Sequence, residues 1–218
     1  MDKVDIAAAD LRRLVALKTG ADCLPLPRAT LYAEALEGVR ETAKLDTPLR
    51  VRHFMAQLAH ETGGFRGLVE SLNYRDPQRL AQMFSNVQGV AHAERLIAAG
   101  PVAIGSCIYD YKLGNGGPES GDGYRFRGRG FIMNTGRANY NSVQKYAGFD
   151  PVLQHDPDSL GQPVAAAKAA AAFWEDRRLN AAADADEIDQ ITRVVNGPAM
   201  AGKAERRAWL AEAEKIWR

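Results

Sequence analysis

The sequence predicts a mainly α-helical protein, and three observations lead to this prediction. Alanine-rich segments with apolar residues three and four positions apart run through most of the 218 residues. Prolines that suit first helical turns and glycines that suit helix ends recur between these segments. Only residues 114–123 are so rich in glycine that they must form a loop, and only the residues just after them alternate or cluster as strands do.

The first third of the chain is expected to form three helices. Apolar residues at helical spacing mark the first two, with Leu11, Leu14 and Val15 in a helix that ends at Gly20, and Tyr32, Leu36, Val39 and Ala43 in the next. Thr47 and Pro48 then supply an N-cap and a first-turn proline for a third helix. The pair Gly63-Gly64 should end it.

The rest of the chain is expected to continue as shorter helices around a small β element. The helices are predicted over residues 77–84, 90–99, 102–111, 137–146, 164–177, 187–195 and 202–218. Residues 124–127 and 131–133 are predicted to be two short strands joined by Gly128-Arg129-Gly130. No repeat or low-complexity linker divides the chain, so we expect a single domain over residues 1–218.

Composition excludes several classes of function. The formal net charge is +1, so no overall field draws the chain to nucleic acid or to an anionic membrane. Two cysteines, Cys23 and Cys107, do not make a disulfide framework, and we expect two reduced thiols. The acidic N-terminus does not resemble a signal peptide, and no run of about 18 apolar residues could span a bilayer. We therefore expect synthesis in a cytoplasm.

Glu61 is notable for its place in the third predicted helix. It lies at the end of that helix, directly after His60 and two residues before Gly63. The C-terminal end of a helix carries partial negative charge, so a carboxyl group there holds its proton more tightly, as a general acid must. Helix stability gives no reason for a glutamate there. The alternative interpretation is a surface glutamate exposed to solvent.

Glu70 follows nine residues later, beyond a turn built on Gly63, Gly64 and Gly67. A helix that ends in one carboxylate, a glycine turn and a second carboxylate can present two acids to one groove. Glycoside hydrolysis requires such a pair, one protonated and one ionised, on either side of the scissile bond. The spacing alone is a weak signal, and the surrounding motifs decide the interpretation.

Those motifs resemble glycoside hydrolase family 19, which contains chitinases and many phage endolysins. Several separate segments match in the family's order over about residues 50–200. Besides the segments around Glu61 and Glu70, they are Lys112-Leu-Gly-Asn-Gly, Gly121-Asp-Gly-Tyr-Arg-Phe-Arg-Gly-Arg-Gly-Phe-Ile, Thr135-Gly-Arg-Ala-Asn-Tyr and Ile191-Thr-Arg-Val-Val-Asn-Gly.

The resemblance implies a fold and a mechanism. It implies a lysozyme-like helical domain of two lobes, with the small β element beside the active-site cleft, and an inverting reaction that needs no cofactor. Glu61 matches the family's general acid and Glu70 its general base. Thr135 matches the serine or threonine that holds the attacking water, and a hydroxyl group can orient water without competing as an acid.

Four more positions are expected to contact substrate. His60 matches the histidine beside the acid, and Asn139 and Asn196 match sugar-binding asparagines. Met133 departs from the family, which usually has glutamine in an Ile-Gln-Leu or Ile-Gln-Ile segment there. Asn134 could supply an amide instead, but on a strand it would point to the opposite face. The departure concerns sugar contacts more than the chemistry.

Other charged groups have two interpretations each. Arg125, Arg127, Arg129 and Arg137 could bind the acidic groups of peptidoglycan, or they could pair internally with acids such as Asp122. The basic last helix could bind membranes, but Trp209 and Trp217 at helical spacing favour core packing. His53, His60 and Glu61 lack the His-Glu-x-x-His spacing, so we expect no metal ion.

These observations together predict a glycosidase that acts as a monomer on peptidoglycan or chitin strands, without a separate wall-binding module. Small size and the lack of a leader or a disulfide framework favour an endolysin, made in the host cytoplasm and released to the cell wall through another factor. A chitinase of the same family and a toxin delivered by a secretion machine remain open. From another class, a non-catalytic carbohydrate-binding protein would bind glycans without releasing reducing ends.

Overall fold

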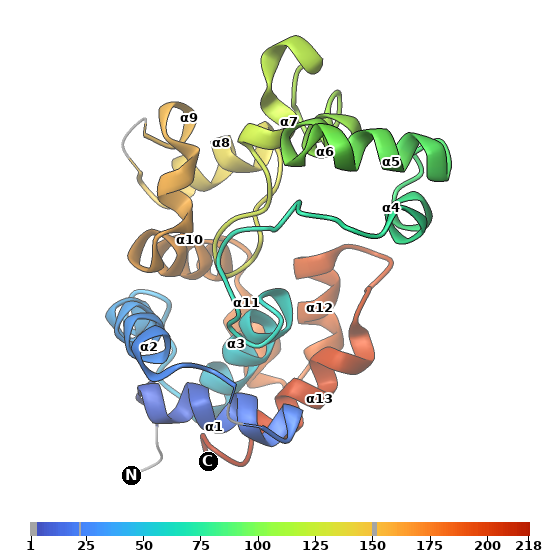
Figure 1. The fold of residues 1–218 in the computed structure, drawn as a ribbon. Helices are drawn as coiled ribbons and strands as arrows, with labels where there is room; N and C mark the ends of the chain where they lie inside the picture. Colours follow the sequence, from blue (N-terminus) through green and yellow to red (C-terminus); the bar gives the residue numbers. More distant parts are fainter. Residues whose placement is uncertain (1–3, 22, 150–151) are drawn as a thin grey trace. The chain divides into compact units, whose positions relative to one another are not determined.

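A computed structural model describes residues 4–21, 23–149 and 152–218, and this part of the chain is mostly helical (Figure 1). The mainly α fold class predicted from the sequence is confirmed. The chain forms two compact units. Unit 1 comprises Met1–Leu68, Gly130–Ile132 and Leu160–Arg218, and unit 2 comprises Val69–Arg129 and Met133–Ser159.

Unit 1 contains the first three helices and the last four. They are α1 (Ala8–Thr19), α2 (Leu26–Arg40), α3 (Pro48–Glu61), α10 (Pro163–Asp176), α11 (Leu179–Asp184), α12 (Ile188–Asn196) and α13 (Lys203–Ala213). Helix α3 begins as predicted, because the Thr47 side chain accepts a hydrogen bond from the Arg50 backbone N–H at 3.3 Å and Pro48 is the first helical residue.

Helix α3 is the centre of unit 1 because it is buried on nearly all its faces. Every residue from His53 to Ala59 is buried, and α3 packs against α11, α12 and α13 (Figure 1). A helix buried all round is typical of the interior of a domain. Phe54 also meets Trp174 of α10 edge to face, with 5.2 Å between ring centroids. The site residues at the end of α3 therefore stand on a rigid element.

The end of the chain belongs to the same core. Trp209, Leu210, Ala213, Ile216 and Trp217 are all buried, and the Trp217 indole donates to the Asp5 carbonyl at 2.9 Å. Core packing is thus confirmed for the last helix, in preference to a membrane-binding face. Among the described residues, none of the helices combines the length and apolar character required to cross a bilayer. Cys23 and Cys107 are both free thiols, as expected.

Unit 2 contains shorter helices. They are α4 (Pro77–Met83), α5 (Val90–Ala99), α6 (Pro101–Tyr109), the 3-10 turn η1 (Pro118–Ser120), α7 (Asp122–Arg125), α8 (Arg137–Tyr146) and α9 (Val152–His155). A second 3-10 helix, η2 (Pro157–Gly161), includes the last crossing from unit 2 to unit 1. An apolar cluster packs beneath α4, α5 and α6, formed by Leu72, Leu80, Val87, Ala93, Ile104 and Ile108.

The two predicted strands are wrong. Residues 122–125 form the single turn α7, because Gly105 of α6 allows close approach to the Tyr124 backbone: a Cβ on Gly105 would lie 2.9 Å from Tyr124 Cα. Residues 131–133 form a turn, since Phe131 is buried against other rings of unit 1. The β structure of the described chain consists of two isolated antiparallel bridges, both at Arg129. Short apolar runs cannot be assigned by periodicity alone.

Candidate active site

The seven residues expected in the site divide between the two units. His60, Glu61 and Asn196 belong to unit 1, whereas Glu70, Met133, Thr135 and Asn139 belong to unit 2. Each unit therefore holds one of the two predicted catalytic glutamates, together with its own set of neighbours.

Glu61 is the last residue of α3, and its carboxylate pairs with the guanidinium of Arg206 from α13. The Glu61 side chain is 16% exposed and that of Arg206 only 1%. A second nitrogen of Arg206 donates to Gln57 Oε1, one turn earlier on α3. The Gln57 amide in turn donates to Thr192 Oγ1 at 3.5 Å. Glu61 is therefore a fixed, mostly buried carboxylate, and the interpretation as a solvated surface glutamate is wrong.

Arg206 is a functional candidate that sequence reasoning missed. The helix end opposes a negative charge on Glu61, but the guanidinium beside it stabilises that charge and fixes the direction of the carboxylate. A signal was available, because Arg206 shares a helical face with Trp209, Leu210 and Ala213, three, four and seven positions later. A cation on an apolar helix face indicates a buried acidic partner.

His60 is held in a neutral form. Burial, together with the positive charge of Arg206, lowers the pKa of His60 to about 4. Gly202 leaves room for the ring, since a Cβ there would lie 2.3 Å from His60 Cε1. Asn196 Oδ1 accepts the Ala201 backbone N–H at 2.7 Å and thereby orders the turn that leads to Gly202. At neutral pH His60 can accept and donate hydrogen bonds, but it carries no proton for acid catalysis.

Glu70 accepts hydrogen bonds on both carboxylate oxygens. The Tyr109 hydroxyl donates to Oε1 at 2.8 Å and the Gly128 backbone N–H donates to Oε2 at 3.0 Å. The Glu70 backbone N–H also donates to the Gly128 carbonyl at 2.8 Å. Burial and the nearby negative charge of Glu70 raise the pKa of Tyr109, so its phenol remains a donor. Two donors aimed at one carboxylate fix its direction, as the positioning of a general base requires.

Thr135 and Glu70 border the same small space above Gly128. A Cβ on Gly128 would lie 3.2 Å from Thr135 Oγ1 and 3.3 Å from Glu70 Oε2. The Thr135 hydroxyl donates to the Met133 carbonyl at 3.1 Å, so its oxygen can still accept a hydrogen bond. Asn139 Nδ2 donates to the Thr135 carbonyl at 2.7 Å. Unit 2 thus brings Glu70 and Thr135 together, and Asn139 holds the Thr135 carbonyl while the Met133 carbonyl holds its hydroxyl.

Met133 lies in a turn and not on a strand, and its φ is +46°. A positive φ is uncommon for a residue with a long side chain. Asn134 is buried and exchanges backbone hydrogen bonds with Arg129 at 2.8 and 3.0 Å. The argument that a strand sends the two side chains to opposite faces therefore does not apply. The roles of Met133 and Asn139 in binding sugar stay predictions.

The four arginines of the sequence cluster are engaged inside unit 2. Arg137 Nε contacts Asp122 Oδ2 at 2.7 Å, Arg129 pairs with Asp158, and Arg127 lies 3.4 Å from the same aspartate. Arg125 donates to the Gln154 carbonyl at 2.6 Å. Internal pairing with acids is confirmed for Arg127, Arg129 and Arg137, and Arg125 is held by a backbone carbonyl. No three His, Cys, Asp or Glu side chains of the described residues gather as metal ligands do.

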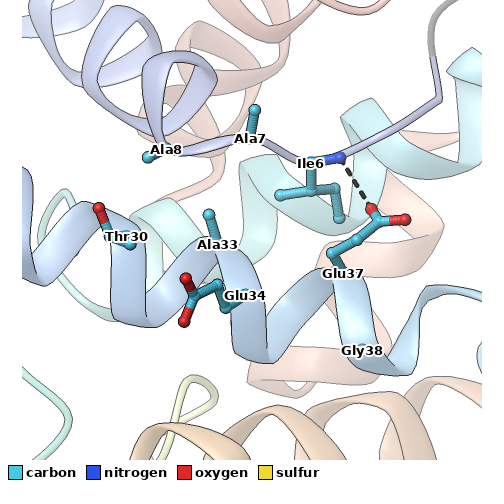
Figure 2. Close-up of a pocket in the computed structure, with 8 residues that line it drawn as sticks. All are labelled: Ile6, Ala7, Ala8, Thr30, Ala33, Glu34, Glu37 and Gly38. Atoms are coloured by element: carbon cyan, nitrogen blue, oxygen red, sulfur yellow. Dashed lines mark hydrogen bonds between the residues drawn. The ribbon is translucent and has the colours of Figure 1, made fainter.

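A cavity of about 560 Å³ lies elsewhere in unit 1, and two glutamates, Glu34 and Glu37, are among the residues that line it (Figure 2). Glu37 has both oxygens occupied, since it accepts the Ile6 backbone N–H at 2.9 Å and Arg40 Nε at 2.8 Å. Glu34 is exposed and follows the same helical face. Figure 2 shows Glu37 reaching up from α2 to the segment before α1. These contacts anchor that segment, and they do not form an acid and base pair.

Comparisons with known proteins bear on the family and the fold of the chain. No protein-family model matches the chain. It is 32% identical over 164 residues to a glycosyl hydrolase family 19 domain-containing protein of Haemophilus influenzae. The aligned region covers 75% of this chain and 78% of that protein. Its fold is similar to that of chitinase C from Streptomyces griseus HUT6037, with a TM-score of 0.57, 16% identity and coverage of 99% of this chain and 78% of that one.

The structural likeness shows a helical fold of the chitinase type. The sequence likeness shows the family: this chain belongs to glycoside hydrolase family 19. The resemblance found in the motifs around Glu61 and Glu70 is therefore confirmed.

Proposed function

We propose that this chain is an endolysin that hydrolyses β-1,4 linkages between the N-acetylhexosamines of peptidoglycan, with Glu61 as acid and Glu70 as base. The observation that carries the proposal is the difference between the two carboxylate environments. Glu61 lies beside a buried guanidinium, whereas Glu70 lies between a phenol and a backbone amide, with Thr135 Oγ1 bordering the same space. The donors and the Thr135 hydroxyl around Glu70 suit a base that activates water, and the role of acid falls to Glu61, the other carboxylate of the family's motifs.

In the proposed reaction, water attacks the anomeric carbon as the glycosidic bond breaks. Glu61 gives its proton to the leaving oxygen, and Glu70 takes a proton from the water. Thr135 accepts the second hydrogen of that water, because its own hydroxyl hydrogen is directed to the Met133 carbonyl. A single displacement inverts the β linkage, so the new reducing end is first released as the α anomer. An inverting reaction calls for carboxyl groups roughly 6.5–9.5 Å apart, which a crystal structure with a bound oligosaccharide would measure.

Parallel digestion of purified peptidoglycan and chitin tests the proposal. The expected products from peptidoglycan are muropeptides with new reducing ends. Glu61→Gln and Glu70→Gln should each lower kcat by about 100-fold or more while circular dichroism stays unchanged. Glu34→Gln, on the exposed face of α2, is the matched control and should keep full activity. Wild-type turnover by Glu61→Gln would remove it from the role of acid.

A chitinase is the second candidate, and it is favoured by the likeness of the fold to a chitinase. Both substrates contain β-1,4-linked N-acetylhexosamines, so the same acid and base could act on either. Efficient release of chitin oligomers, with peptidoglycan left intact, would replace the endolysin proposal by the chitinase. Binding to either polymer without any new reducing ends would instead indicate a carbohydrate-binding protein. The endolysin proposal includes access to the cell wall through another factor.

A further inference from the structure

Unit 2 contains a cavity of about 290 Å³ beside the segment that follows Glu70. One wall is formed by Asn73, Tyr74 and Arg75, and the other by Ile97, Gly100 and Pro101, where α5 ends and α6 begins. Its volume is near the lower end of the roughly 300–1,000 Å³ range of ligand sites. The walls combine an amide, a phenol and a guanidinium with apolar surface, a mixture that suits a substituted sugar.

Tyr74 connects this cavity to the proposed base. Its ring packs edge to face on Phe84, with 6.0 Å between centroids. Burial, and then the negative charge of Glu70, raise the pKa of Tyr74, whereas Arg79 lowers it. The charges of both Glu70 and Arg79 therefore act on the Tyr74 phenol. Tyr74 lines the cavity and lies four residues after Glu70, so the cavity adjoins the segment that carries the proposed base.

Arg75 differs from the four arginines at 125, 127, 129 and 137. It is exposed, lines the cavity, and forms no hydrogen bond or ion pair with any residue that the structure describes. The arginines at 125, 127, 129 and 137 are instead held by internal acceptors. Asn73 has one weak contact, from its amide nitrogen to Ser71 Oγ at 3.5 Å. Arg75 and Asn73 can thus both engage a ligand without breaking a strong internal bond.

We propose that this cavity is a sugar subsite for a carboxylate-bearing residue of the glycan strand, with Arg75 binding the carboxylate. The inference rests on the proposed function and names the part of peptidoglycan that is recognised. A guanidinium binds a carboxylate through two parallel hydrogen bonds. Asn73 would bind an amide or hydroxyl group, and Ile97 and Pro101 would contact the apolar part of the sugar. The carboxylate can come from the lactyl group or from the stem peptide.

The test compares Arg75→Ala with Arg95→Ala on three forms of soluble glycan strand. Arg95 is the matched control, because it is also exposed but does not line the cavity. The strands carry intact stem peptides, or free lactyl carboxylates after amidase treatment, or carboxylates converted to neutral amides. Arg75→Ala should raise KM about tenfold on at least one acidic form, with kcat unchanged and no effect on the neutral form. The effect should shrink in high salt.

The outcomes separate the subsite from the function. An effect on intact strands only identifies a stem-peptide carboxylate, and one on amidase-treated strands only identifies the lactyl carboxylate. Equal losses on acidic and neutral strands, or equal losses for Arg75→Ala and Arg95→Ala, would overturn the subsite and leave the hydrolase intact. If the wild type cleaves no strand, the proposed function fails. NMR titration of the full-length protein with muramyl dipeptide would then test the cavity separately, since Arg75→Ala should abolish its binding.

Discussion

Replacing Arg206 by methionine tests the geometry around Glu61. Arg206→Met keeps a long, flexible side chain at a position that is 1% exposed. It removes the ion pair with Glu61 and the hydrogen bond to Gln57 Oε1. The Glu61 carboxylate is then left mostly buried without a partner, and the Gln57 oxygen loses its donor.

The structure sets the expected magnitude of the loss. Removing one partner of a fully buried ion pair lowers the free energy of unfolding by about 3–5 kcal/mol. Glu61 remains 16% exposed, so water can partly solvate it and the cost falls toward about 2 kcal/mol. The unsatisfied Gln57 oxygen adds about 1 kcal/mol. We expect a total loss of about 3 kcal/mol, or a fall in Tm of roughly 6–12 °C for a chain of this size.

Urea unfolding of a double-mutant cycle measures this loss. The cycle comprises wild type, Arg206→Met, Glu61→Gln and the double variant, with Arg207→Met as the control. Arg207 is exposed and pairs with Asp189 at 2.6 Å, so its removal should cost at most about 1 kcal/mol. The double variant should be more stable than the sum of the single losses by about 1–3 kcal/mol, because it no longer buries an uncompensated charge. An additive cycle, or a loss below about 1 kcal/mol for Arg206→Met, would refute the reasoning.

Four further substitutions test other parts of the site. Gly128→Ala introduces a methyl group 3.2–3.3 Å from Thr135 Oγ1 and Glu70 Oε2, so kcat should fall about 10- to 100-fold with little loss of stability; unchanged kcat would show that this space is not used. Thr135→Val should lower kcat more than it raises KM, and a change in KM alone would reassign Thr135 to substrate binding. Tyr109→Phe removes one of the two donors that orient Glu70, so kcat should fall with little change in KM; an unchanged kcat would contradict the assignment of the base. His60 has a pKa of about 4 when folded and 6.5 when unfolded, so the unfolded state binds more protons between these values and stability should fall as pH drops from 6.5 to 4. Allowing for partial exposure, the contribution of His60 to this fall is about 1–2 kcal/mol. Urea titrations should show a smaller fall in His60→Gln than in the wild type, with a remainder to which His53 contributes because burial lowers its pKa too; an equal fall in both proteins would contradict the prediction.

The fold could be predicted where the signals are local. Thr47 and Pro48 begin α3 through contacts within one turn, and Gly63 and Gly64 end it because they adopt φ values of +59° and +84°. The prediction failed at residues 124–127, where alternation of aromatic and basic residues indicated a strand. That segment is a helical turn because of its close approach to α6, and no pattern within four residues reports a contact with a distant helix.

The site could be predicted only in part, for a related reason. The motifs identify Glu61 and Glu70 by their order along the chain, but the groups that set their environments are remote. Arg206 lies 145 residues from Glu61, and Tyr109 lies 39 residues from Glu70. The helical phase of Arg206 could have indicated a buried partner, although it could not have named which acid. Nothing in the sequence around Tyr109 distinguishes its phenol from other core tyrosines.

The two carboxylate environments are built independently of each other. Glu61 is held by partners from α3 and α13, which belong to unit 1, and Glu70 is held by Tyr109 and Gly128, which belong to unit 2. Each environment therefore consists of residues from its own unit. Glu61 and Glu70 are only nine positions apart in the sequence, with the glycine turn between them. A short segment of chain therefore connects the two environments. This arrangement explains how two glutamates so close in sequence can acquire different partners, a cation for one and neutral donors for the other.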